Sequence, residues 1–193
     1  SCCCCYFEDR VVQMSGMAAT TNGEWQLLDD GGSETPWIPR RKHCSVAFDG
    51  QVFIIGGFEG LSDGMNDVWS YDVDRQSWKC VNEDAGWSGR DGHVAIVFNG
   101  SLFVIGGTND PYSCKADVWQ SEDGGVRWRE LCTFAPWKER WQHSAVVHED
   151  RIFILGGWGG YFMNDVWSSP DGLHWIQETS SAEWQPRMFH CAV

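Results

Sequence analysis

A pair of adjacent glycines recurs at a fixed interval, and no other feature of the chain restricts its fold as much. The pairs are Gly56-Gly57, Gly106-Gly107 and Gly156-Gly157, fifty residues apart. Four histidines follow the same period, with intervals of 50, 50 and 47 residues: His43, His93, His143 and His190. A period of this length is typical of architectures that stack one supersecondary unit many times.

Eleven of the thirteen tryptophans keep the same period as the glycines. Each complete repeat has one tryptophan in an Asp-Val-Trp sequence and a second one eight or nine residues later. A third opens the pattern Trp-x-x-Arg-x-x-His, which occurs four times, at Trp37, Trp87, Trp137 and Trp184. Only Trp141 and Trp158 lie outside the repeat, so chance cannot explain the pattern.

Each repeat contains four short segments with the composition of β-strands. In the first complete repeat, residues 43–48 and the apolar run 51–55 flank Asp49-Gly50, and Asn99-Gly100 has the same place in the next. Such dipeptides between apolar runs predict two-residue hairpins, because both turn residues need positive φ. A third strand carries Asp-Val-Trp, and a fourth carries the later tryptophan. Helical periodicity is absent, so we predict an all-β fold.

One four-stranded sheet cannot cover its own two faces, so successive sheets are expected to stack around a shared axis as the blades of a β-propeller. The glycine pair closing the second strand, the aromatic residue in the third and the tryptophan in the fourth resemble the kelch repeat. This resemblance covers about residues 37–193, with repeats at 37–86, 87–136 and 137–183 and the start of another at 184–193. Residues 1–36 are expected to form a degenerate first blade, with Trp25 in its fourth strand and Asp9–Gln13 in its third.

The number of blades is about four, whereas kelch propellers usually close with six or seven. The resemblance therefore implies that these units are part of a longer ring or are completed by a partner. A closed ring of four blades, in which the last strand joins a sheet begun by residues 1–28, is the alternative. Between their third and fourth strands, Ser121–Trp128 and the shorter Ser169–Trp175 resemble the Asp-box of sialidases, which implies tight hairpins and not an active site.

Charge and cysteine usage restrict the partners and the compartment. The net charge of −13 argues against a nucleic-acid or anionic-membrane partner, and no stretch approaches the ~20 apolar residues of a membrane span. There are nine cysteines, and the five outside the run Cys2–Cys5 lack metal-ligand spacing, which predicts mostly free thiols and favours a reducing intracellular compartment. The role of the run Cys2–Cys5 stays open between a lipid or metal site and a plain strand.

The arginine of Trp-x-x-Arg-x-x-His precedes the innermost strand of each blade. Four guanidinium groups are therefore expected around the mouth of the channel: Arg40, Arg90, Arg140 and Arg187. In kelch-type substrate adaptors of ubiquitin ligases, arginines at the corresponding place hold acidic peptide side chains, so the resemblance implies a partner-binding role. The alternative is that each arginine caps backbone carbonyls or stacks on the neighbouring tryptophan.

Residues that vary between the repeats are expected to determine specificity. The loops after the glycine pairs share a face with the arginines, and Trp141 follows Arg140 directly. The aromatic candidates for partner binding are Phe58, Tyr112, Trp141, Trp158 and Tyr161. Aromatic side chains beside arginines suit a peptide or a sugar, both of which use stacking together with bidentate hydrogen bonds.

No catalytic residue, metal or cofactor is predicted. The four histidines are expected near the axis, too far apart to share a metal and hydrogen-bonded to neighbouring backbone. Galactose oxidase, which shares kelch-like repeats, needs a Tyr–Cys crosslink, a second tyrosine and two histidines around copper, and the four tyrosines here form no such set. We expect a non-catalytic scaffold that binds a protein or peptide, with a carbohydrate-binding or carbohydrate-active propeller as the alternative.

Overall fold

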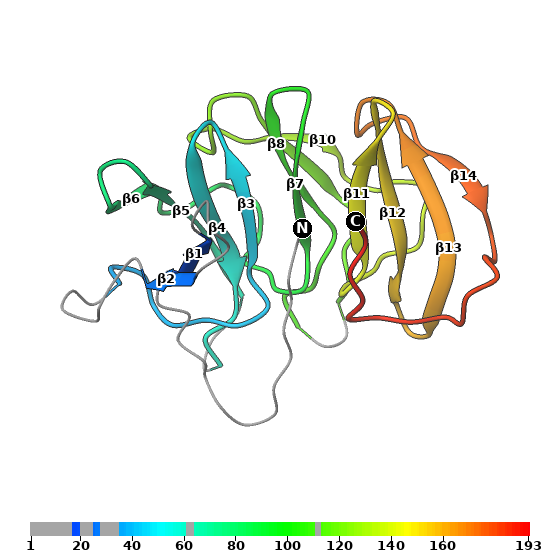
Figure 1. The fold of residues 1–193 in the computed structure, drawn as a ribbon. Helices are drawn as coiled ribbons and strands as arrows, with labels where there is room; N and C mark the ends of the chain where they lie inside the picture. The colour runs from blue at the N-terminus through cyan, green and yellow to red at the C-terminus, as the bar shows by residue number, and fades with distance from the viewer. Residues whose placement is uncertain (1–16, 20–24, 28–34, 61–63, 111–112) are drawn as a thin grey trace.

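The computed structural model describes residues 17–19, 25–27, 35–60, 64–110 and 113–193, and these residues contain fourteen strands and no helix (Figure 1). The prediction of an all-β fold is confirmed. In the described part of the chain, no helix is long and apolar enough to cross a membrane. The segments Cys2–Cys5 and Asp9–Gln13 lie outside the described residues.

Three antiparallel four-stranded sheets stand side by side, each meandering through consecutive strands (Figure 1). The first blade contains β3 (Cys44–Phe48), β4 (Gln51–Gly57), β5 (Met65–Asp72) and β6 (Ser77–Asn82). The second contains β7 (Val94–Phe98), β8 (Ser101–Ile105), β9 (Val118–Ser121) and β10 (Arg129–Cys132). The third contains β11 (Ser144–His148), β12 (Arg151–Trp158), β13 (Phe162–Ser169) and β14 (Ile176–Thr179).

A smaller sheet precedes the three blades. It pairs β1 (Met17–Ala19) with β2 (Trp25–Leu27), with Ala19 opposite Trp25. Each complete repeat expected from the sequence contains one of the four-stranded sheets, while the boundaries between repeats remain a prediction.

The predicted hairpins connect the first and second strands of the blades. Asp49 and Gly50 have φ of 48° and 72°, and Asn99 and Gly100 have 47° and 70°. The third blade achieves the same turn without glycine, because Glu149 and Asp150 take φ of 45° and 56°. These turns lie at the upper end of the molecule in Figure 1.

The glycine pair at the end of the second strand is required by close packing. Gly57 has a φ of 108°, and a Cβ atom there would lie 2.8 Å from the Cβ of His43. Any side chain at this position would therefore collide with the start of the blade's own innermost strand.

Two apolar clusters fill the spaces between the blades. Between the first and second blades, Phe53 and Val68 pack with Leu102 and Val104. Between the second and third blades, Phe103 and Val118 pack with Ile152 and Ile154. Each cluster therefore combines opposite faces of two successive sheets, as stacking around an axis requires.

Tryptophans contribute to both clusters, with Trp87 in the first and with Trp137 and Trp175 in the second. In each blade the tryptophan of the entry pattern meets the later tryptophan, which lies in the fourth strand or directly before it, edge to face with centroids 5.5 to 6.0 Å apart. The pairs are Trp37–Trp78, Trp87–Trp128 and Trp137–Trp175. Edge-to-face pairs of this kind add about 0.5–1.5 kcal/mol to the gain from burying the rings.

Candidate functional site

In each of the three complete blades, the arginine of the entry pattern is enclosed within the blade. Arg90 and Arg140 are fully buried and Arg40 is 9% exposed. Arg90 donates through Nε to the carbonyl of Ser88 and through Nη1 to the carbonyl of Gly106, 2.9 Å away. Its guanidinium carbon lies 5.5 Å from the centre of the Trp87 ring.

An aspartate of the Asp-Val-Trp sequence completes this arrangement. Arg90 holds Asp117 through two parallel hydrogen bonds of 2.8 and 2.7 Å, and the indole Nε1 of Trp119 donates to the same carboxylate. Burial opposes the charged form, but the hydrogen bonds from Arg90 and Trp119 outweigh it and lower the pKa of Asp117. We call this unit the Arg–Asp–Trp clamp.

The clamp recurs in the other two complete blades. Arg40 pairs with Asp67 in the first blade and Arg140 with Asp165 in the third. For these arginines the contacts are those of the structural alternative, namely carbonyl capping and stacking on tryptophan. Their donors are engaged inside the blade, so a partner-binding role for Arg40, Arg90 and Arg140 remains only a prediction.

Arg187 differs from the other three. Its side chain is exposed, stacks on Trp184 with 5.6 Å to the ring centre, and donates to the carbonyl of Gln185. Within the described residues no carboxylate forms an ion pair with it. It is the one predicted arginine whose guanidinium group is accessible.

The histidines of the entry patterns pack between tryptophan rings and glycine backbone. His143 is 5% exposed, lies 6.5 Å from Trp137, and both its ring nitrogens lack a hydrogen-bond partner among the described residues. The expected backbone hydrogen bond is therefore not formed by His143. Burial, together with the positive charge of Arg140, holds the pKa of His143 well below its usual value. The described residues contain no group of three side chains arranged for a metal ion.

A row of backbone hydrogen bonds joins the residues just before these histidines. Gly92 N donates to the carbonyl of Lys42, Gln142 N to that of Gly92, and Phe189 N to that of Gln142, at 3.0, 2.7 and 3.1 Å. All four residues have φ between 52° and 59°. This row ties each repeat to the next near the axis, and we call it the hub row.

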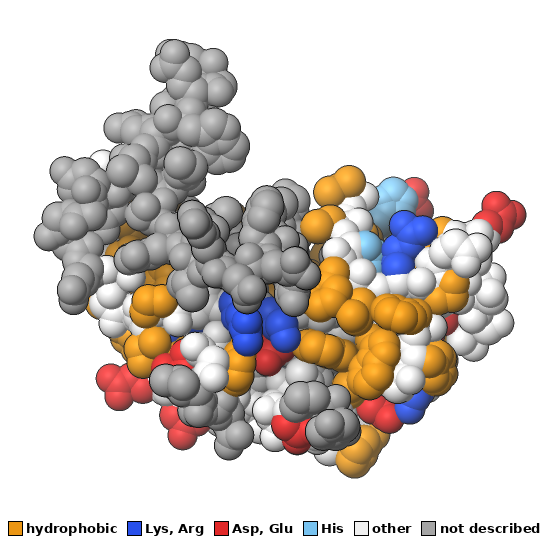
Figure 2. Space-filling model, turned by 90° about the horizontal axis from the view of Figure 1, so that it is seen from below, with side chains coloured by type: hydrophobic (Ala, Val, Ile, Leu, Met, Phe, Trp, Pro, Cys, Tyr) orange, Lys and Arg blue, Asp and Glu red, His pale blue; other side chains and the backbone are white. Residues whose placement is uncertain are grey.

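The side chains around the hub row differ from blade to blade and form the candidate binding surface. They lie on the face of the loops that follow the glycine pairs, at the lower end in Figure 1. Figure 2, which looks at this face, shows hydrophobic side chains gathered beside a group of basic ones. We call it the lower face.

Trp141 is the centre of the aromatic part of the lower face. Its ring meets those of Trp158 and Phe189 edge to face, at 6.5 and 6.2 Å. The ammonium group of Lys42 lies over the same ring, 4.4 Å from its centre. Two backbone hydrogen bonds of 3.0 Å between Trp141 and Trp158 fix the pair.

Charged groups adjoin this aromatic cluster. Lys42 Nζ lies 3.6 Å from Oδ1 of Asp91. Burial raises the pKa of Asp91, although the charge of Lys42 acts in the opposite direction. Arg41 is exposed and its guanidinium carbon lies 5.3 Å from the ring centre of Phe58.

The outer part of the surface is formed by the loop of the third blade. Tyr161 and Phe162 are 58% and 52% exposed. Of the predicted aromatic candidates, the structure brings Trp141 and Trp158 into contact, places Tyr161 in the adjoining loop, and puts Phe58 beside Arg41. Tyr112 lies outside the described residues.

Lys42, Asp91 and Phe189 were not among the predicted site residues. Each occupies one of the two positions that follow the repeated arginine, and these positions differ in every repeat. The rule that variable positions carry specificity could therefore have identified them, had it been applied inside the entry pattern as well as in the loops.

Comparison with known proteins agrees with the repeat. The model of the KLHDC2/KLHL20/DRC7 Kelch-repeats domain matches residues 9–193. The solved structure of YjhT superposes with a TM-score of 0.71 at 19% identity, covering 88% of this chain and 59% of that one. At this identity the likeness shows the fold alone, and the chain spans less than two thirds of the length of YjhT. No curated protein matches the sequence.

Proposed function

We propose that this chain, which belongs to the family of the KLHDC2/KLHL20/DRC7 Kelch-repeats domain, binds a protein partner through its lower face. The kelch fold itself is consistent with a propeller that mediates protein interaction. The observation that carries the proposal is the aromatic cluster around Trp141, with an exposed tyrosine and phenylalanine beside it.

Aromatic and basic side chains are the groups that contribute most to protein interfaces. Tryptophan, tyrosine and arginine are enriched among residues whose truncation costs more than about 2 kcal/mol of binding free energy. The lower face combines Trp141, Tyr161 and the exposed Arg41. Trp141 and Arg41 are held by ring contacts with their neighbours before any partner arrives, which reduces the entropy lost on binding.

The contacts on the lower face are those of recognition and not of chemistry. Lys42 is engaged with Asp91 and with the ring of Trp141. We therefore infer a non-catalytic role, in which the variable side chains around the hub row and the neighbouring loops choose a protein or peptide segment.

A display experiment tests this function. The purified chain would select binders from a phage library of random peptides, and affinities of the enriched peptides would be measured for the chain and for two variants. Replacing both Tyr161 and Phe162 by alanine is expected to weaken binding at least about tenfold, the loss of one good anchor. The control Leu173→Ala removes a similarly exposed apolar side chain, 43% exposed, from the hairpin between β13 and β14. Equal affinities for the double variant, or loss only in Leu173→Ala, would contradict the proposal.

A further inference from the structure

The two interfaces between blades close differently at their upper end. The hairpin between the third and fourth strands of one blade leans against the preceding blade. At the second interface a Cβ atom on Gly172 would lie 2.7 Å from the ring of Phe103, so backbone and ring are in direct contact. Gly125 has the same place in the other hairpin, since its N–H also bonds the serine hydroxyl and its carbonyl also accepts from the following indole. It meets Val68 instead of an aromatic ring, and the additional residue Gly124 has nothing within 4 Å of its Cβ position.

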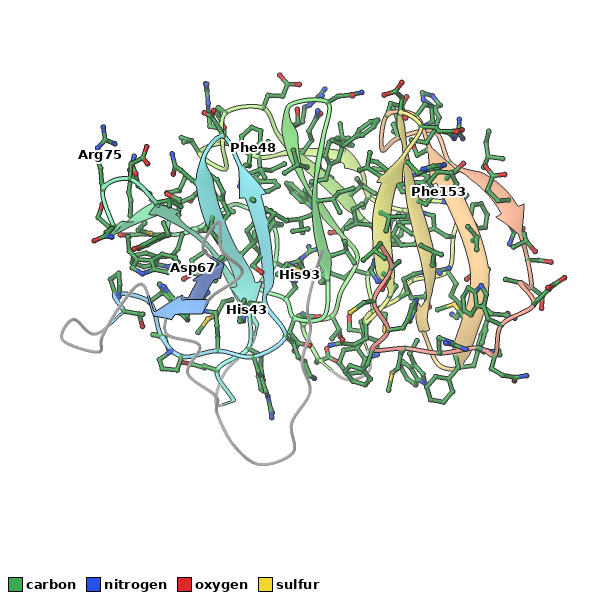
Figure 3. All side chains as sticks on the ribbon, viewed as in Figure 1. His43, Phe48, Asp67, Arg75, His93 and Phe153 are labelled. Carbon is green, nitrogen blue, oxygen red and sulfur yellow. The ribbon has the colours of Figure 1, made fainter. Side chains whose placement is uncertain are left out.

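A hollow results at the first interface. The hairpin of the second blade is one residue longer, and it touches the first blade through Gly125, whose Cβ position lies 3.0 Å from Val68. Above that contact the two blades enclose a space of about 490 Å³, lined by Phe48 and Phe53 on one side and by Gly124 on the other. Figure 3 shows Phe48 near the upper end of β3, away from the lower face. The volume is within the range of small-molecule sites.

Three polar side chains that line this hollow lack the side-chain partners that their equivalents have in the other two blades. In the second blade, Gln120 donates to Ser101 at 3.2 Å and accepts from Arg129 at 2.9 Å. Ser101, Gln120 and Arg129 lie on the second, third and fourth strands of this blade. Gln120 is paired with Phe103 on one side and with Arg129 on the other. Their polar groups satisfy one another, and no ligand is needed.

The third blade closes its polar group in the same way. Arg151 donates twice to the hydroxyl of Ser168, at 3.1 and 2.6 Å, and that hydroxyl donates to Glu178 at 2.5 Å. Ser168 lies opposite Phe153, as Gln120 lies opposite Phe103.

In the first blade the corresponding residues are Gln51, Ser70 and Lys79. Ser70 lies opposite Phe53 and Lys79, and all three line the hollow. Ser70 is 2% exposed, and within the described residues no side-chain hydrogen bond engages any of the three. Gln51 is half-buried and Lys79 is exposed, so these polar groups face the hollow and can bond either water or the polar groups of a ligand.

The chemistry of the lining selects the class of ligand. Two cations, Arg75 and Lys79, face four carboxylates: Asp49, Asp72, Glu122 and Asp123. Both signs of charge line the hollow. A strongly anionic ligand would therefore lie close to carboxylates, and a strongly cationic ligand would lie close to the two basic groups. An amide, two serine hydroxyls and an ammonium group pair well with ligand hydroxyls, which both donate and accept.

We propose that this hollow binds a neutral saccharide. Hydroxyl groups of the sugar would reach Gln51, Ser70 and Lys79, while its C–H face would pack on the tilted pair of Phe48 and Phe53, whose ring centres are 6.2 Å apart. The site is independent of the protein-binding function, because it lies at the opposite end of the blades.

The proposal is tested with three sugars of similar size that differ in charge: neutral glucose, cationic glucosamine and anionic glucuronate. Binding to the purified chain would be followed by saturation-transfer NMR and by titration. Glucose is expected to bind with a Kd of about 1 mM or tighter, and better than either charged sugar. Lys79→Met, at an exposed position, should weaken that affinity at least about tenfold, the effect of a lost hydrogen bond from a charged donor.

Two controls locate the site. Lys138→Met removes an exposed ammonium group of the third blade that does not line the hollow, and should leave glucose binding within about twofold. Replacement of Tyr161 and Phe162 by alanine should also leave it unchanged, whatever that variant does to a protein partner. Absence of binding by all three sugars would overturn the proposal, as would preference for a charged one. Affinity that survives Lys79→Met or falls in the lower-face variant would equally overturn it.

Discussion

The second and third blades have the same topology and nearly the same inward pattern, yet they bury one of their faces to very different degrees. Phe103 is 1% exposed and Val118 is fully buried. Their equivalents in the third blade, Phe153 and Val166, are only half-buried. The difference arises because the third blade covers the second, while the described residues place no further blade over the third.

This contrast shows where the stability of the fold originates. A blade supplies its own hydrogen bonds through four paired strands, but it cannot remove the apolar residues of both faces from water. The remaining apolar face is buried only when the neighbouring blade packs against it. The same rule explains the arginines, since Arg187 belongs to an entry pattern but pairs with no aspartate of an Asp-Val-Trp sequence among the described residues.

The largest difference in stability is expected when the equivalent phenylalanines of the second and third blades, Phe103 and Phe153, are each replaced by alanine. Phe103→Ala should lower the free energy of unfolding by about 3–5 kcal/mol, because it empties a closed interface. Phe153→Ala should cost only about 1 kcal/mol, because its ring already contacts solvent. Urea unfolding followed by circular dichroism would measure both. Equal losses would show that the face of the third blade is covered in solution.

A somewhat smaller difference in stability is expected between breaking a complete clamp and removing Arg187, which pairs with no aspartate among the described residues. Asp117→Ala leaves the buried guanidinium of Arg90 without its carboxylate, and should destabilise by about 3 kcal/mol. Arg187→Ala removes an exposed side chain and should change stability by less than about 0.5 kcal/mol. Urea midpoints of the two variants give the comparison. A large loss in Arg187→Ala would mean that this arginine has a partner that the described residues do not show.

The smallest expected effect is a loss of stability at acidic pH, and it should be larger for the buried His143 than for the half-buried His190. Because the folded-state pKa of His143 lies well below 6.5, the unfolded chain binds the proton more readily. The stability contribution is therefore present above the unfolded pKa and is lost as the pH falls below about 6.5. Between pH 7 and 5.5 the loss should be on the order of 1 kcal/mol.

Two single substitutions show which histidine causes this pH dependence of stability. Burial also lowers the pKa of His190, but less strongly. Arg140, His93 and His190 are the charged or titratable groups that influence His143. His143→Leu should therefore flatten the profile of urea midpoint against pH more than His190→Leu does. An unchanged profile in His143→Leu would refute the assignment.

The repeat made most of the fold predictable, because its signals act within one blade. Asp49-Gly50 and Gly56-Gly57 impose local φ values, and Asp-Val-Trp marks a strand whatever lies beside it. The aromatic part of the lower face was largely predictable too, since Trp141 and Trp158 interrupt the period.

The contacts between elements were harder to infer. The clamp joins Arg90 to a carboxylate 27 residues away, and the sequence alone could not decide whether that arginine faces a partner or its own blade. Lys42 was not predicted because its contact is with Trp141, 99 residues further along the chain. The hollow beside Ser70 depends on one additional residue in a hairpin of the next blade, which no local pattern reveals.

The hub row has a consequence for the order in which the molecule assembles. Strand pairing inside a blade joins neighbours in sequence and can form early, whereas the links from Lys42 to Gly92 and from Gly92 to Gln142 join residues fifty positions apart. Such contacts must wait until two complete sheets exist, so they report the docking of finished units. Every additional blade then contributes one more link of the same kind, and cooperativity should grow stepwise along the chain as in a one-dimensional array.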